Sequence, residues 1–140
     1  MTKRIGIVGH GTLGSYLVRK IDESEDLSVA FVHDVDRRKL SGLPQSLVLN
    51  SIEEAKERRA DIIVEVASSE WVHEFAHVIL KFSNLLIVSV AALAEKGLRE
   101  KLDTMAKANN THYYISHGAI VGLDGVRNGK EIIQDVRLQL

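Results

Sequence analysis

The chain of 140 residues has no cysteine, one proline and few aromatic residues. Without cysteine, it can form neither a disulfide nor a zinc–thiolate site, and it has no thiol nucleophile. Its 18 basic and 19 acidic residues leave a formal net charge of −1, which argues against nucleic acid or an anionic membrane surface as a partner.

Long hydrophobic runs are also absent. Residues 5–8 are too short a run for the core of a signal peptide. The longest apolar run, residues 85–94, is interrupted by Ser89 and falls far short of the roughly 20 residues that span a membrane. Together with the lack of cysteine, this pattern predicts a cytoplasmic protein with no membrane partner.

Short apolar runs alternate with segments of helical periodicity. Strands are predicted at residues 4–8, 28–32, 62–66, 85–90 and 112–115, with a weak strand at 47–49. Helices are predicted at 13–21, 72–80 and 98–108. A further helix should begin at Ser51, where Glu54 would complete a capping box. This alternation predicts a single α/β domain with a Rossmann-type, doubly wound parallel sheet.

The end of the chain follows a different pattern. Val136, Leu138 and Leu140 alternate with polar residues, which is typical of a strand with one wet face. We therefore expect an NAD(P)-binding domain over residues 1–125. Residues 126–140 should begin a second, catalytic or dimerisation domain that this chain does not complete.

A glycine-rich loop follows the first predicted strand and opens the first helix, the context that dinucleotide binding requires. Gly9 permits the tight turn, Gly11 lets a pyrophosphate approach the backbone, and Gly14 lets the helix pack close to the strand. The helix N-terminus offers N–H groups and a partial positive charge to the phosphates. The predicted binding residues of the loop are Gly9, His10, Gly11, Thr12, Leu13 and Gly14.

An acidic residue ends the second predicted strand. Asp34 lies 20 residues after Gly14, where a carboxylate can accept hydrogen bonds from both ribose hydroxyls. Arg37 and Arg38 follow closely, and an arginine there could hold the 2′-phosphate of NADP. Asp34 would repel that phosphate, so NAD is the favoured cofactor and NADP the second candidate.

The string H-E-F-A-H at residues 73–77 matches the zinc-protease motif, with Glu74 as the base. The apolar stripe of this helix centres near Val72, which predicts that His73 and His77 are solvated surface residues. Glu95 would be a third ligand only if the strand at 85–90 were helical. We therefore predict no metal site.

Three other turns follow predicted strands at the carboxyl edge of the sheet, where ligands bind. The first and second, at residues 67–69 and 90–92, have small side chains that leave room for ribose and nicotinamide; Ser69 is a candidate helix cap. The third contains His117, a weak candidate for a catalytic base. His33, beside Asp34, belongs near the adenosine.

Three blocks of sequence, at residues 7–11, 63–68 and 118–124, make the chain similar to the N-terminal half of the L-aspartate dehydrogenase family. That family oxidises L-aspartate to iminoaspartate, which yields oxaloacetate and ammonia, with NAD or NADP. The resemblance implies phosphate contacts at residues 9–14 and a nicotinamide-side contact at Ala119. It also implies that Ala67 and Ser68 line the cofactor.

The resemblance also carries departures. Members of that family are about twice as long, and their catalytic histidine lies beyond the point where this chain stops. His117 stands where a serine is expected, and Val121 where a glycine is expected. The resemblance therefore implies that the catalytic histidine lies outside this chain, which should be inactive alone, and it leaves the catalytic residues within the chain unknown. L-aspartate and a homodimer partner are expectations for the full-length form.

Two other functions are compatible with a glycine loop. A stand-alone NAD(P)-binding or sensing module without catalysis would fit a chain that ends after one domain. A methyltransferase that uses S-adenosylmethionine is disfavoured by the close G-x-G-x-x-G spacing and by the block at residues 118–124. A longer reading frame with a histidine-bearing second half would favour the dehydrogenase.

Overall fold

The computed structural model describes residues 2–117, 131, 134, 135 and 137. Within that part of the chain, five parallel strands form one sheet in the order β2-β1-β3-β4-β5. The strands are β1 (Lys3–Val8), β2 (Leu27–His33), β3 (Ile62–Glu65), β4 (Asn84–Ile87) and β5 (Tyr113–Ile115). The α-helices are α1 (Thr12–Asp22), α2 (Ser69–Ile79) and α3 (Leu98–Asn109). Three 3₁₀-helices complete the set: η1 (Arg37–Leu40), η2 (Ile52–Arg58) and η3 (Val90–Ala94).

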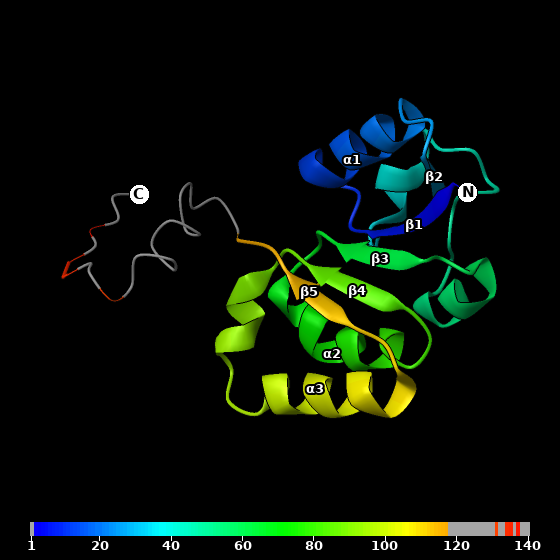
Figure 1. Cartoon of the computed structure of the whole chain (residues 1–140). Helices are drawn as coiled ribbons and strands as arrows, with labels where there is room; N and C mark the ends of the chain where they lie inside the picture. Colours follow the sequence, from blue (N-terminus) through cyan, green and yellow to red (C-terminus); the bar gives the residue numbers. More distant parts are fainter. Residues whose placement is uncertain (1, 118–130, 132–133, 136, 138–140) are drawn as a thin grey trace.

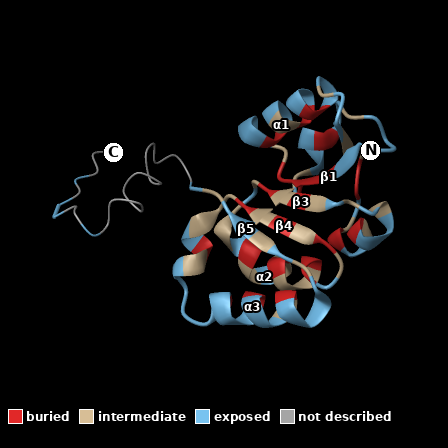
Figure 2. Cartoon of the chain, in the orientation of Figure 1, coloured by how far each residue is buried: buried red, intermediate tan, exposed pale blue. Residues whose placement is uncertain are grey.

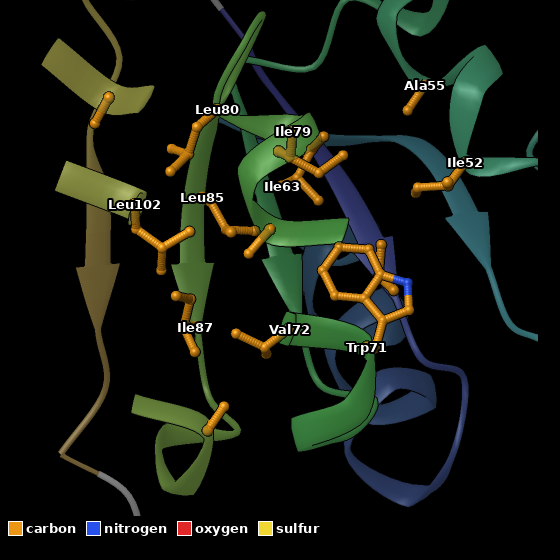
Figure 3. Close-up of a cluster of buried hydrophobic side chains, with 14 of the residues drawn as sticks. Ile52, Ala55, Ile63, Trp71, Val72, Ile79, Leu80, Leu85, Ile87 and Leu102 are labelled. Carbon is orange, nitrogen blue, oxygen red and sulfur yellow. The ribbon is translucent and has the colours of Figure 1, made fainter. Parts of the chain in front are cut away.

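Helices cover both faces of the sheet, as the predicted doubly wound fold requires. In Figure 1, α1 lies over one face, and α2 and α3 lie over the other. Successive strand residues point to opposite faces, so they divide between two apolar cores. The smaller core, under α1, includes Ile5, Ile7, Val18, Ile21 and Val32. The larger core, under α2 and α3, contains Phe31, Ile63, Trp71, Leu85, Ile87 and Leu102, and buried segments follow it along the sheet (Figures 2 and 3).

Two predicted strands lose two or more of their predicted residues in the structure. The weak strand at 47–49 is reduced to one parallel bridge between Val48 and Val32. This bridge places residues 47–49 beside β2, at the edge of the sheet, where the Rossmann strand order has its third strand. In this chain that third strand is reduced to the single bridge. The strand predicted at 85–90 ends at Ile87, because the N–H groups of Val88 and Ser89 bond to the Glu65 carboxylate.

Helix starts differ from prediction at two places. The capping box at Ser51 is wrong: Ser51 donates to the Glu53 side chain and does not cap the backbone, and the segment is the 3₁₀-helix η2. At the start of α2, Ser68 rather than Ser69 is the cap, since its hydroxyl accepts from the N–H of Trp71 at 3.3 Å.

Gly14, Val18 and Ile21 form the buried face of α1. Leu13, the first residue of the helix predicted at 13–21, is 46% exposed. Positions i, i+4 and i+7 share one face of a helix. Because the glycine occupies the position closest to the sheet, the apolar side chain before it turns to solvent.

Gly6 in β1 lies beneath the ring of Phe31, its partner across the β1–β2 ladder. A Cβ at Gly6 would lie 2.5 Å from that ring and 3.1 Å from the Cγ1 atom of Ile63. This strand glycine therefore makes room for the largest fully buried side chain of the larger core.

Candidate dinucleotide site

The glycine loop connects β1 to α1 at the carboxyl edge of the sheet. Gly9 has φ of +93°, a conformation that strongly favours glycine. A Cβ at Gly9 would also lie 2.5 Å from the carbonyl oxygen of Val66, and one at Gly14 would overlap the carbonyl oxygen of Gly9. The predicted tight turn and close helix–strand packing are both confirmed.

Gly11 is different, because a Cβ there would meet nothing within 4 Å. It is the N-cap of α1, offers no side-chain cap and is followed by a first turn without acidic residues. The first N–H groups of a helix lack intrahelical partners and carry partial positive charge. This open, uncapped N-terminus therefore suits an anion such as a pyrophosphate.

Asp34, just after β2, is 7% exposed and turned towards the glycine loop. Its Oδ2 accepts from the N–H of His10 at 2.7 Å, and its Oδ1 accepts from the N–H of Asp36 at 2.8 Å. Burial acts to raise the pKa of Asp34, but these N–H groups and the Lys39 ammonium, 3.5 Å away, outweigh it and lower the pKa. The ionised carboxylate retains lone pairs that can accept hydroxyls.

A cavity of about 200 Å³ opens between the ends of β1, β2 and β3. Predicted residues from three separate segments meet in its wall: Gly9 and Gly11, Asp34, and Ala67 with Ser68. The sequence analysis missed several other residues of the cavity wall. They are apolar or basic residues beside the predicted motifs, and their positions in the sequence give only a weak signal. The complete lining is Val8, Gly9, Gly11, His33, Asp34, Val35, Lys39, Val66, Ala67, Ser68 and Trp71.

The remaining predicted loop residues lie beside the cavity rather than in its wall. The His10 ring is turned to the carbonyl oxygen of Lys39, 2.8 Å from its Nδ1. Thr12 and Leu13 are exposed residues of the first turn of α1. His117 is exposed and does not line the cavity. Ala119, the rest of the loop at 118–125, the proposed domain boundary and the last predicted strand lie outside the described residues.

The two arginines after Asp34 point elsewhere. Both Arg38 Nε and Nη2 lie 2.8 Å from the carboxylate of Asp36, and the Arg37 guanidinium donates to the Asn50 side chain at 2.7 Å. Lys39 is the cation that lines the cavity. The structure therefore shifts the candidate 2′-phosphate contact from the arginines to this lysine.

Glu65, the last residue of β3, has the most buried carboxylate that the structure describes, at 0% exposure. Its oxygens accept hydrogen bonds from the turn after β3 and from the turn after β4. In the sequence, Glu65 is one acid within an apolar run. Such an isolated acid indicates a buried charge that is stabilised by hydrogen bonds, but the sequence does not identify the donors.

The H-E-F-A-H segment lies on α2, and our prediction of two solvated histidines was wrong. His73 is half-buried and its Nε2 lies 3.2 Å from Glu95 Oε2. His77 is also half-buried, and its Nδ1 has no hydrogen-bond partner within the described part of the chain. Burial first, and then Lys101 and Lys81, lower the pKa of His77.

The described residues contain no cluster of three or more histidine or acidic side chains arranged to hold a metal ion. They also include no helix that is long and apolar enough to cross a bilayer.

Comparison with known proteins agrees with this geometry. Residues 9–116 match the family model described as the NAD-binding domain of homoserine dehydrogenase. An L-aspartate dehydrogenase of Methanosarcina mazei is 36% identical over 132 residues, which cover 89% of this chain and 48% of that protein. An aspartate dehydrogenase domain-containing protein of Danio rerio is 37% identical over 85% of this chain and 45% of its own length. The chain thus spans about half the length of the curated relatives it matches.

Solved structures lead to the same fold. The crystal structure of an aspartate dehydrogenase from Thermotoga maritima superposes with a TM-score of 0.68 at 27% identity, over 94% of this chain and 52% of that one. The WlbA dehydrogenase from Bordetella pertussis, at a TM-score of 0.75 and 13% identity over 94% of this chain and 42% of that one, supports the fold alone. The Rossmann fold and the resemblance to L-aspartate dehydrogenases are confirmed. The chain belongs to the family of NAD-binding domains found in homoserine dehydrogenase, and its cofactor is a nicotinamide dinucleotide.

Proposed function

We propose that this chain is the dinucleotide-binding part of an L-aspartate dehydrogenase. The observation that carries the proposal is the convergence of Gly9, Gly11, Asp34, Ala67 and Ser68 on one cavity at the carboxyl edge of the sheet. A dinucleotide of the NAD class fits this wall, because open space faces Gly11 and an ionised carboxylate faces the same cavity. The curated relatives named L-aspartate dehydrogenase supply the substrate of the proposal.

In this function, the chain binds the dinucleotide and orients it. The N-terminus of α1 holds the pyrophosphate, and Asp34 accepts the hydroxyls of the adenosine ribose. Ala67 and Ser68 support the dinucleotide between the glycine loop and the nicotinamide end. The bound nicotinamide accepts a hydride from the α-carbon of L-aspartate. The substrate clamp and the catalytic base belong to a second domain of the full-length form.

Cofactor choice follows from the two charges in the cavity wall. Asp34 favours a free 2′-hydroxyl and disfavours a 2′-phosphate, so we propose NAD as the preferred cofactor. Lys39, whose side chain is 47% exposed, is the residue through which NADP would be accepted. The reaction uses a common metabolite and a common cofactor, and the chain has no cysteine, which fits the reducing cytoplasm.

The deciding experiment measures NADH formation with L-aspartate at alkaline pH, on this chain and on any longer reading frame that contains it. We expect this chain to bind NADH without turnover and the longer form to oxidise L-aspartate. Turnover by the 140-residue chain would show that no second domain is needed and would make His117 the leading base. Failure of this chain to bind NADH would contradict the proposal at its first step.

A binding or sensing module without catalysis is the second candidate. The observation that favours it is the cavity wall itself, in which Lys39 is the single cationic side chain and already lies 3.5 Å from Asp34. This wall therefore offers no clamp for the two carboxylates of aspartate. A longer form that binds NADH but fails to oxidise L-aspartate would favour the sensing module.

A further inference from the structure

The Glu65 carboxylate lies between two turns of the backbone, one after β3 and one after β4. We propose that Glu65 is a positioning residue for the dinucleotide: it fixes the turn at residues 66–68 against the turn at residues 88–89, so that the cavity keeps its shape. The inference rests on the proposed function, because it takes a dinucleotide as the occupant of the cavity.

Four donors from these turns surround the carboxylate. Its Oε1 accepts from the N–H of Ala67 at 2.8 Å and from the hydroxyl of Ser89 at 2.7 Å. Its Oε2 accepts from the N–H groups of Ser89 at 3.0 Å and Val88 at 3.2 Å. One oxygen thus joins both turns, and the second oxygen anchors the turn after β4.

Packing alone does not explain an acid at this position. Ile63 and Glu65 share one face of β3, and Ile87 on β4 belongs to the same apolar core. A buried carboxylate is costly unless it is hydrogen-bonded. Glu65 takes part in none of the ion pairs among the described residues. An apolar side chain would fill this space at lower cost, but it would leave three of the four donors without an acceptor; the N–H of Val88 would keep its bond to the backbone carbonyl oxygen of residue 65, at 3.2 Å.

The turn held by Glu65 supports the glycine loop. A Cβ at Gly9 would lie 2.5 Å from the carbonyl oxygen of Val66 and 2.8 Å from the nitrogen of Ala67, so the two backbones touch. Ala67 and Ser68 also line the cavity, whereas Glu65 does not. Glu65 therefore acts on the dinucleotide through Ala67, and a displaced turn would move two walls of the cavity together.

The test compares variants that remove acceptors or donors one at a time. Glu65→Gln keeps the shape of the side chain, but an amide accepts at its oxygen only and its NH₂ group would face N–H donors. We expect Glu65→Gln to weaken NADH binding about tenfold or more in a fluorescence titration. Ser89→Ala removes one donor and no charge, so it should fold normally and lose about two- to fourfold.

A matched variant separates positioning from general destabilisation. Leu102→Ala removes a fully buried side chain of α3 that does not line the cavity. It should lower the melting temperature while leaving the NADH dissociation constant within about twofold of the wild-type value. If Glu65→Gln lowers the melting temperature but binds NADH as Leu102→Ala does, Glu65 is only structural and the inference is overturned.

A measurement without ligand keeps this inference distinct from the proposed function. Amide hydrogen exchange in the free protein should be slow at Ala67 and Ser89, whose N–H groups bond to the Glu65 carboxylate, and faster in Glu65→Gln. If the wild-type protein does not bind NADH, the proposed function fails, and with it the positioning of a dinucleotide, whatever the exchange shows. If the wild-type protein binds NADH but exchange at these amides is unchanged in Glu65→Gln, the Glu65 contacts do not hold the turns and the inference alone fails.

Discussion

At the residue scale, Asp34 combines a structural contact with a proposed ligand contact. Its two oxygens hold the N–H groups of His10 and Asp36, and the same carboxylate faces the cavity. The loop proposed to bind phosphate and the acid proposed to select the ribose are therefore coupled through a single contact, the hydrogen bond from His10 to Asp34. A substitution at Asp34 should change both the ribose contact and the order of the loop.

Asp34→Ala should cost about 1.5–3 kcal/mol of NADH affinity, since hydrogen bonds to a charged group are lost. This corresponds to roughly a 10- to 150-fold rise in the dissociation constant. The affinity for NADPH should fall less than the affinity for NADH, because removing the carboxylate also removes its repulsion of the 2′-phosphate. Fluorescence titration with both cofactors measures the difference, and equal losses would rule out the 2′-hydroxyl contact.

Lys39→Met provides the reciprocal variant. It removes the cation beside Asp34 while retaining an unbranched side chain, so NADPH should bind roughly fivefold more weakly, equivalent to about 1 kcal/mol. NADH should change little. An unchanged NADPH affinity in the same titration would show that Lys39 does not contact the 2′-phosphate.

His77 should make stability depend on pH. Its pKa is lowered in the folded protein by burial and by two lysines, so the unfolded chain takes up the proton first. As pH falls through about 6.5, the free energy of unfolding should therefore decrease, until pH passes the folded pKa and both states are protonated. Urea denaturation of the wild type and of His77→Gln between pH 8 and 5 tests this: the variant should lose less stability, and parallel curves would contradict the assignment.

At the element scale, β1 lies between two neighbouring strands and leads into the glycine loop. It pairs with β2 on one side and β3 on the other, and it ends at the glycine loop. The contact between Gly6 and Phe31 fixes its separation from the core beneath α2. The position of the glycine loop therefore depends on packing in the strand that precedes it.

Gly6→Ala should destabilise the fold by about 1–3 kcal/mol, because the new methyl group overlaps the buried ring of Phe31. Gly42→Ala is the matched control, since a Cβ there meets nothing within 4 Å. It should be neutral or slightly stabilising. Chemical denaturation of both variants gives the comparison, and equal stabilities would show that the core accommodates the methyl group.

Strong periodic elements were predictable from the sequence, and contacts between distant segments were not. The run around Ile63 indicated a buried strand, and the glycine spacing indicated the tight turn between β1 and α1. By contrast, the end of β4 is set by Glu65, which lies 23 and 24 residues before the amides it accepts. The surface position of Leu13 likewise depends on how closely Gly14 approaches Gly9. Such features follow from tertiary contacts, which local pattern does not encode.

At the scale of the whole molecule, the two apolar cores lie on opposite faces of one sheet, and the cavity opens at an edge they share. A ligand bound there contacts strands that pack against both cores. Binding should therefore stabilise the entire domain rather than one loop.

Saturating NADH should raise the melting temperature. At a free concentration of 100 times the dissociation constant, the added stability is about 2.7 kcal/mol, or roughly 10 °C for a domain of this size. Gly11→Val should melt as the ligand-free wild type does and gain no shift, since its side chain would fill the open space before α1. If NADH does not raise the melting temperature of the wild-type protein, the glycine loop is only a turn and does not bind the dinucleotide.

The chain has a single tryptophan, and that residue lines the cavity. Trp71 is 5% exposed, stacks obliquely on Phe75 with centroids 5.5 Å apart, and has an indole nitrogen with no hydrogen-bond partner in the described residues. Its position in the larger core is visible in Figure 3. Because all indole emission comes from this one position, and that emission overlaps the absorption of reduced nicotinamide, the protein carries an intrinsic optical reporter. Energy transfer from Trp71 to bound NADH would measure occupancy without any added label.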